Sequence, residues 1–198
     1  MLRSLPVLKC LVFVSALCPL VWLIYELQVG ALEPDPAKAL VLELGIWAYR
    51  FLLLALCVTP LRQLTGWAPL MRLRRMVGLF AFFYGFLHLI SYLWFLLGWR
   101  FSELWQDVLE RRYITVGFLG FVILLLMAVT SFKALQRKMG RRWVQLHSLV
   151  YVAGVAVAVH FYWLSRINID EAVLYGLMML TLLGWRAISV LIKKANKT

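Results

Sequence analysis

The chain has 198 residues, of which 64% are hydrophobic and 15% are charged. Soluble globular domains have about 45–50% apolar and about 25% charged residues, so this composition excludes that class. It also excludes a disordered chain, because disordered segments are poor in apolar residues. A helix needs about 20 apolar residues to cross a bilayer. We therefore expect a small all-α polytopic membrane protein, with too few remaining residues for a soluble catalytic domain.

Apolar runs separated by charged clusters predict six transmembrane helices. They cover residues 7–25, 39–59, 76–97, 113–132, 143–164 and 172–192. The first run is long for a signal peptide and lacks a small-residue cleavage site, so we expect it to be retained as a span. Pro60 is expected to close the second span, and residues 101–112 are expected to form a short amphipathic surface helix. No internal repeat or linker is visible, so residues 1–198 are expected to form one transmembrane domain.

Charge is distributed unevenly between the two predicted faces. One face carries basic clusters at residues 72–75, 137–142 and 193–197 and no acidic residue, whereas all nine acidic residues fall on the other face. Basic residues near short loops mark the cytoplasmic side, which predicts that both termini are cytoplasmic. Such residues also contact anionic lipid head groups, so the net charge of +12 requires no nucleic-acid partner.

The three histidines, His88, His147 and His160, all fall within predicted spans. Ionisable residues are costly inside a membrane, and they usually mark a functional site there. A proton relay would combine them with intramembrane acids, and a zinc site would need three or four clustered ligands. The sequence favours neither arrangement, and its three cysteines form no CxxC pair. Haem iron needs only one or two axial ligands, so imidazoles from different helices predict a haem site.

The depth of each histidine favours one pair. At 1.5 Å per residue, His88 and His160 differ in depth by about 7.5 Å, and His88 and His147 differ by about 12 Å. His88 and His160 are therefore predicted to hold a haem in the outer half of the membrane. His147 lies about 140° around an ideal helix from His160, so only a local distortion, for example near Gly154, would aim both at one partner. A second haem at His147 is the weaker alternative.

Two further features each have two interpretations. Gly78 and Gly85 leave space either for a flat cofactor or for close helix packing, which also favours small residues in membranes. Arg50 and Arg186 lie within predicted spans, where a guanidinium could bind a haem propionate or a flavin phosphate. Pairing with Glu43 or snorkelling toward the membrane surface is the alternative that we favour for these arginines.

Three motifs resemble a known family. They are RRMVGLFAFFYGFLH at residues 74–88, RRWVQLHSLVY at residues 141–151 and HFYW at residues 160–163. They are similar to the haem-binding membrane subunits of the MsrPQ methionine sulfoxide reductase system, the MsrQ family. That family belongs to the ferric-reductase-like transmembrane superfamily, and the resemblance covers essentially the whole chain.

The resemblance implies a b-type cytochrome of the bacterial inner membrane that also uses FMN. Such a subunit takes electrons from the quinone pool or from a cytosolic flavin reductase. It passes them to a periplasmic molybdenum-containing MsrP-type subunit, which repairs methionine sulfoxide in oxidised proteins. His88, His147 and His160 are the haem-iron ligands carried over. The superfamily pattern has a fourth histidine, and Arg74 and Arg75 stand near its place as candidate cofactor-binding residues.

Two other functions stay open at this point. One is direct reduction of ferric chelates by a cytochrome without a protein partner. The other is a non-redox, proton-coupled transporter, although the chain lacks the broken spans and repeat symmetry typical of transporters.

Overall fold

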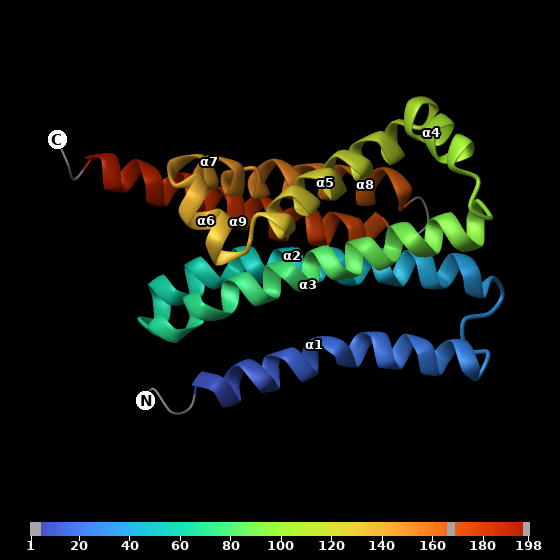
Figure 1. The fold of residues 1–198 in the computed structure, drawn as a ribbon, viewed down its shortest axis with the longest axis horizontal. Coiled ribbons are helices and arrows are strands. Elements are labelled where there is room, and N and C mark those ends of the chain that lie inside the picture. The colour runs from blue at the N-terminus through green and yellow to red at the C-terminus, as the bar shows by residue number, and fades with distance from the viewer. Residues whose placement is uncertain (1–4, 166–168, 196–198) are drawn as a thin grey trace.

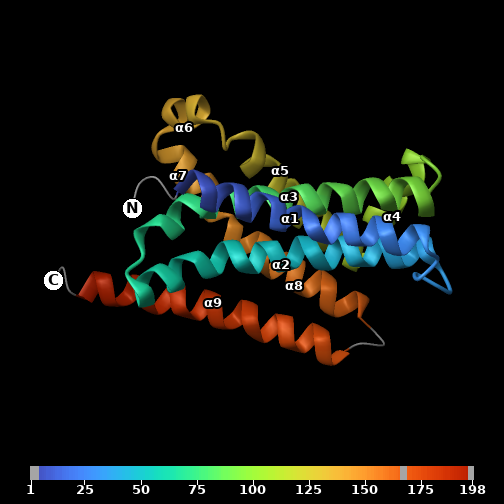
Figure 2. The ribbon, with the colours of Figure 1, turned by 90° about the horizontal axis from the view of Figure 1, so that it is seen from below.

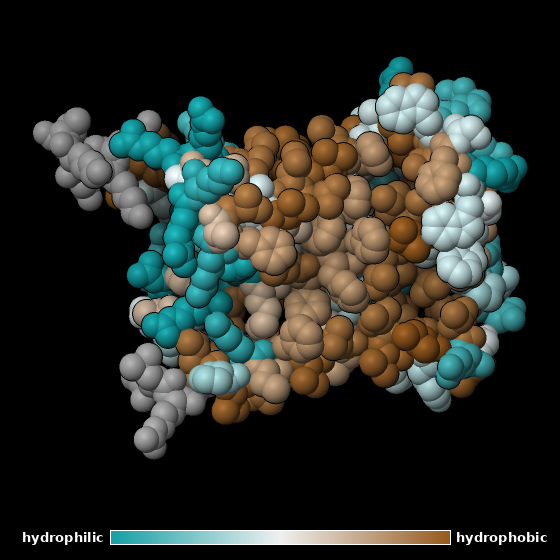
Figure 3. Space-filling view, viewed as in Figure 1, coloured by the Kyte–Doolittle hydropathy of each residue, from teal (hydrophilic) through white to brown (hydrophobic). Residues whose placement is uncertain are grey.

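The computed structural model describes residues 5–165 and 169–195, and within these ranges the chain is helical with no strand. Within the described residues, six helical segments are long and apolar enough to cross a membrane. They are Leu5–Gln28, Pro36–Thr65, Leu70–Leu96, Arg112–Val129, Arg141–Leu164 and Ile169–Ile192. Each overlaps one predicted span, so the all-α, six-span fold class is confirmed. Apolar side chains form a broad band across the middle of the molecule, with polar side chains at both ends (Figure 3).

The elements follow in chain order. They are α1 (Leu5–Gln28), α2 (Pro36–Thr65), the 3₁₀ turn η2 (Ala68–Leu70), α3 (Met71–Ser91), the π-helical turn η3 (Tyr92–Leu96), α4 (Phe101–Glu110), α5 (Arg112–Val129), α6 (Lys133–Met139), α7 (Arg141–Ser148), α8 (Val150–Leu164) and α9 (Ile169–Ala195). Helices α2 and α3 pack along each other, as do α5 and α8 (Figures 1 and 2). Helix α1 begins and α9 ends at the same end of the bundle (Figure 1).

The second span extends beyond its predicted end. Pro60 lies inside α2, and the helix continues to Thr65, so the prediction that Pro60 closes this span was wrong. A proline removes only one backbone donor, and membrane helices tolerate such a loss where neighbouring groups compensate for it. The helix ends at Gly66 instead, which has φ 69° and donates its N–H to the Arg62 carbonyl. Glycine adopts this left-handed conformation without steric cost, and it is a common helix terminator.

The fifth span is interrupted between its two histidines, His147 and His160. Helix α7 ends at Ser148 and α8 begins at Val150, and the Leu149 N–H donates to the Leu146 carbonyl at 3.0 Å. A hydrogen bond to the third preceding residue, in place of the fourth, tightens the helical turn. Side chains after this turn therefore point in other directions than they would on a regular α-helix. The helix between His147 and His160 is therefore distorted at Leu149 and not near Gly154.

The small residues of α3 serve helix packing. A Cβ atom on Gly78 would lie 4.0 Å from the Ala55 Cβ, and one on Gly85 would lie 3.9 Å from the Ala48 Cβ. Both alanines belong to α2, so these glycines face the neighbouring helix across a short distance. Small residues allow such close approach of membrane helices. Of the two interpretations drawn from the sequence, helix packing accounts for Gly78 and Gly85.

Candidate functional site

Two of the three intramembrane histidines meet between the helix pairs. His88 lies near the end of α3 and His160 lies near the end of α8. Their ring centroids are 6.3 Å apart and their planes are inclined by 78°. The two ring centroids are therefore closer together than the depth difference of about 7.5 Å expected from the sequence.

Each of these rings is held by one backbone carbonyl. The His88 Nδ1 lies 2.7 Å from the Val41 carbonyl oxygen of α2, and the His160 Nδ1 lies 2.7 Å from the Tyr113 carbonyl oxygen of α5. A carbonyl only accepts, so Nδ1 carries the proton and donates it in both cases. Nε2 is then the atom with a free lone pair, and neither Nε2 has a hydrogen-bond partner in residues 5–165 and 169–195.

This arrangement fits a metal ion that is held by two imidazoles. Metal-binding histidines usually donate their other ring N–H to a carbonyl or carboxylate, which fixes the tautomer and the ring orientation. An imidazole nitrogen binds a first-row metal at about 2 Å. Two such bonds and two ring radii are compatible with the 6.3 Å between the centroids. The described residues contain no group of three or more His, Cys, Asp or Glu side chains suited to a metal ion. The pair therefore suits haem iron better than zinc.

His147 is not part of this pair. Its ring stacks on Trp143 with centroids 3.9 Å apart, and its Nε2 lies 3.2 Å from the Thr130 Oγ1. The Trp143 indole N–H also donates to the Thr130 carbonyl at 3.0 Å. The His147 ring therefore contacts the end of α5 through its Nε2, whereas His88 and His160 form their hydrogen bonds through Nδ1.

Arg74 and Arg75 lie at the same end of the bundle as His147. Their charges act on the His147 ring, and Arg74 is partly buried whereas Arg75 is exposed. Together with Arg186, Arg74 lines a small cavity of about 10 Å³ between α2, α3, α8 and α9. The Arg186 guanidinium lies 5.9 Å from the centroid of the Tyr151 ring. Among the described residues, neither Arg74 nor Arg186 has a carboxylate partner, so both guanidinium groups are available to an anion.

Arg50 is paired within the protein. Its Nε donates to the Tyr175 hydroxyl at 2.7 Å, and an Nη lies 3.7 Å from a Glu171 carboxylate oxygen. Its guanidinium also lies 4.6 Å from the centroid of the Trp47 ring. Pairing is the alternative that we favoured, but the acidic partner is Glu171 of α9 and not Glu43. These contacts satisfy Arg50 without a cofactor.

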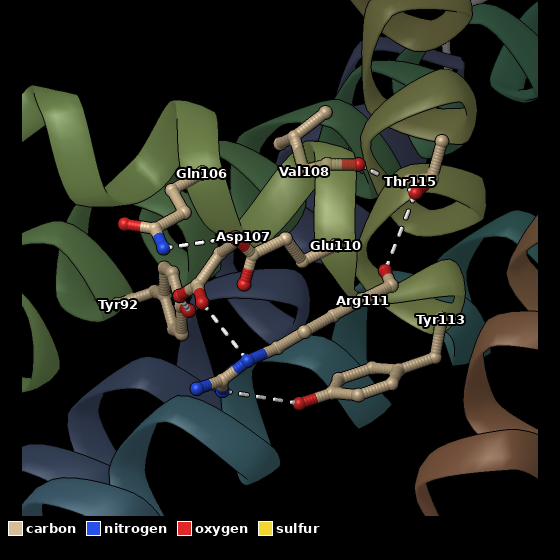
Figure 4. Close-up of polar contacts among 8 residues, drawn as sticks. All are labelled: Tyr92, Gln106, Asp107, Val108, Glu110, Arg111, Tyr113 and Thr115. Atoms are coloured by element: carbon tan, nitrogen blue, oxygen red, sulfur yellow. Dashed lines mark hydrogen bonds and ion pairs between the residues drawn. The ribbon is translucent and has the colours of Figure 1, made fainter.

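The other end of the bundle carries a polar network that joins Tyr92, α4 and the start of α5 (Figure 4). The Asp107 carboxylate accepts hydrogen bonds from the Tyr92 hydroxyl and from the Arg111 Nε, the latter at 2.9 Å. The Thr115 hydroxyl donates to the Val108 carbonyl at 2.6 Å. The hydrogen bond to the Tyr113 hydroxyl and the negative charge of Asp107 both raise the pKa of Arg111. The network ties α4 to the first turn of α5, where the Tyr113 carbonyl holds His160.

Sequence reasoning missed the groups that orient the histidines. The acceptors for His88 and His160 are main-chain carbonyls of Val41 and Tyr113, and every residue has such a carbonyl. The residue numbers show one regularity, because each carbonyl lies 47 positions before the histidine that it binds. This equal spacing can be recognised only after the structure has identified the two carbonyls.

Comparison with known proteins identifies the class. Residues 44–158 match the family described as "Ferric reductase like transmembrane component". The match covers more than half of the chain and includes His88 and His147. The chain is thus a ferric-reductase-like transmembrane protein.

Individual relatives narrow this class to one family. A protein from Xanthomonas oryzae pv. oryzae (strain MAFF 311018) is 42% identical over 190 residues, covering 93% of this chain and 87% of its own length. A protein from Polaromonas naphthalenivorans (strain CJ2) is 43% identical over 184 residues, covering 91% and 84% respectively. Both are named "Protein-methionine-sulfoxide reductase heme-binding subunit MsrQ". The chain belongs to the MsrQ family, as its motifs predicted.

Proposed function

We propose that this chain binds haem b between His88 and His160 and carries electrons across the bacterial inner membrane. The proposal rests on the histidine pair, whose ring centroids are 6.3 Å apart and whose Nδ1 atoms are both hydrogen-bonded to backbone carbonyls. The relatives' names, which describe heme-binding subunits, support the same assignment. A haem b at this position supplies one-electron transfer between its ferric and ferrous states.

The chain's own residues have three tasks in this proposal. His88 and His160 would hold the haem iron through their Nε2 atoms. The Val41 and Tyr113 carbonyls keep the proton on each Nδ1, so the ligating nitrogen stays unprotonated. The apolar spans around the pair exclude water and lower the local dielectric, which is one of the features that tune the potential of a bound haem.

We assign the electron-input side to the end that carries Arg74, Arg75 and His147. Its excess of basic residues supports a cytoplasmic location for this end and for both termini, in contact with anionic lipid head groups. A quinol from the membrane or a cytosolic flavin reductase would deliver electrons there. We assign FMN to the same end, because the Arg74 and Arg186 guanidinium groups, which have no carboxylate partner among the described residues, could bind its phosphate.

The acceptor in this proposal is a periplasmic molybdenum-containing reductase subunit of the MsrP type. That subunit would reduce methionine sulfoxide in oxidised periplasmic proteins. Residues 1–198 would act as one transmembrane domain with one haem. A second haem at His147 is disfavoured, because its Nε2 already faces the Thr130 hydroxyl at 3.2 Å and no second imidazole lies beside it.

The test is haem quantification with reduced-minus-oxidised spectra of the full chain, purified in mild detergent after haem-replete expression. We expect one haem per wild-type chain, near-complete loss in His88→Ala and His160→Ala, and retention of most haem in His147→Ala. Equal partial losses in the His147 and His160 variants would replace this proposal with two stacked haems. A colourless wild-type protein would overturn it and favour the transporter.

A second function is favoured by the match to ferric-reductase-like proteins, namely direct reduction of a ferric chelate without a protein partner. Proteoliposomes loaded with an internal reductant separate the two functions. We expect the haem to be reoxidised by an external MsrP-type subunit much faster than by ferric citrate. The reverse order of rates would establish the second function.

A further inference from the structure

The two histidines are held in the same way by two separate helix pairs. In each pair the accepting carbonyl and the histidine are 47 residues apart, from Val41 to His88 and from Tyr113 to His160. In each pair a glycine follows the accepting residue by one helical turn, namely Gly45 on α2 and Gly117 on α5. The carbonyl and the glycine of a helix turn lie on the same face, so both are directed at the ring.

Glycine is required at positions 45 and 117 because the imidazole rings lie close to the backbone there. A Cβ atom on Gly45 would lie 2.9 Å from the His88 Nδ1, and one on Gly117 would lie 2.6 Å from the His160 Nδ1. Cβ atoms essentially never approach other atoms within 3.0 Å. The rings cannot retreat without breaking their 2.7 Å bonds to the carbonyls. Any side chain at either position would therefore displace the imidazole.

The correspondence extends into the core. Ala81 and Ala153 each precede their histidine by seven residues, and both are 0% exposed. Leu52 and Leu124 each follow their glycine by seven residues, and both are buried. The pairs α2/α3 and α5/α8 are thus two versions of one structural unit. The sequence analysis found no repeat because the units share only a few residues, at positions of close contact.

We propose that Gly45 and Gly117 are positioning residues that set the orientation of the two axial imidazoles. Each glycine admits the ring to the helix surface, and the carbonyl one turn earlier then fixes Nδ1. The outcome is two rings inclined by 78°. This inference rests on the proposed haem site, and it adds the groups that determine the ligand geometry.

The inclination of the rings gives the inference a spectroscopic signature. The EPR signal of a low-spin ferric haem depends on the angle between its axial imidazole planes. Nearly perpendicular planes give a strongly anisotropic signal, whereas parallel planes give a rhombic one. We therefore expect the wild-type protein to show the strongly anisotropic signal, and we expect it to change when either ring is displaced.

The variants are Gly45→Ala and Gly117→Ala in the full chain, with controls at the same helix interfaces. Gly85→Ala is the control for α2/α3, since its Cβ would be 3.9 Å from Ala48. Gly120→Ala is the control for α5/α8, since its Cβ would press on the Val157 side chain at 3.2 Å and not on a histidine. We expect haem content to fall at least fivefold in Gly117→Ala and about threefold in Gly45→Ala. The remaining haem should have shifted EPR g-values, and both controls should keep wild-type spectra.

Imidazole rescue separates positioning from misfolding. In His160→Gly, added imidazole should restore haem binding, and it should do so equally in the double variant Gly117→Ala/His160→Gly, because the free imidazole is not tethered to α8. A double variant that stays defective, or single glycine variants with wild-type haem and EPR spectra, would overturn the inference. If instead His88→Ala and His160→Ala retain haem, the proposed function itself has failed.

Discussion

The hydroxyl of Tyr84 donates a hydrogen bond to the Ala16 carbonyl at 2.8 Å and so joins α3 to the interior of α1. The same hydroxyl accepts from the Leu20 N–H at 3.2 Å. Ala16 and Leu20 are four residues apart, so the hydroxyl lies between two groups that ordinarily bond to each other within a helix. Pro19 beside them has no N–H to donate. The Tyr84 side chain of α3, which is buried, thus completes the backbone hydrogen bonding of α1, a span with few buried residues.

Replacing this hydroxyl should loosen α1 without altering the haem site. We expect Tyr84→Phe to lower stability by about 1 kcal/mol, because two hydrogen bonds are lost while Ala16 and Leu20 can partly bond to each other. Thermal unfolding in detergent measures the change. Tyr162→Phe is the matched control, since Tyr162 is exposed and its hydroxyl has no bond within the described residues. An unchanged melting temperature in Tyr84→Phe would contradict the prediction.

Arg50 should stabilise the contact between α2 and α9 and take no part in electron transfer. Arg50→Met removes the bond to Tyr175 and should cost about 2 kcal/mol, typical of a hydrogen bond to a charged group. Glu171→Gln should cost less than about 1 kcal/mol, because the pair is at 3.7 Å and both side chains are about one-third exposed. Melting curves and a haem redox titration of both variants test this. A large change in haem potential for Arg50→Met would show instead that Arg50 acts on the cofactor.

Asp107 should hold α4 against the start of α5. Asp107→Asn weakens the bonds to Tyr92 and Arg111, and we expect the α4 amides to exchange hydrogen roughly tenfold faster, equivalent to about 1.4 kcal/mol. Hydrogen–deuterium exchange with mass spectrometry reads this directly. Glu103→Gln is the control, because its partner Arg100 is largely exposed and such pairs contribute little. Equal exchange in both variants would refute the role of Asp107.

One face of α4 should lie in the membrane interface. Phe101, Trp105 and Leu109 are spaced by four residues and are 62%, 60% and 68% exposed. Such an apolar stripe on a short amphipathic helix enters the head-group region. In a cysteine-free background in nanodiscs, an environment-sensitive fluorophore at Leu109→Cys should report a more apolar setting than one at Glu110→Cys. Matching emission maxima would show that the stripe faces water.

The sequence predicts the spans well and the details of the site less well. Length and hydropathy are properties of each segment alone, so all six spans could be located, and the depth of His88 and His160 could be counted from the basic clusters. Tertiary contacts decide the rest. Glu171 pairs with Arg50 across two helices, which a preference for the nearby Glu43 could not anticipate.

Main-chain groups account for the other features that the sequence did not predict. The acceptor for His160 is a carbonyl of Tyr113, and no residue type marks such an acceptor in advance. Similarly, the break between α7 and α8 lies at Leu149, where the residue type carries no helix-breaking signal. Glycine is a usual marker of helix irregularity, but Gly154 lies within α8, where a Cβ would meet the Met179 side chain at 2.9 Å.

The separation of His88 and His160 along the chain fixes the order of assembly. Membrane spans are inserted in chain order during synthesis, and His88 belongs to the third span whereas His160 belongs to the end of the fifth. The complete ligand pair therefore exists only after five of the six spans have been made. If haem is held by both histidines, as we propose, it cannot act as a template for the earlier spans, and α2 and α3 would have to pack together before it binds.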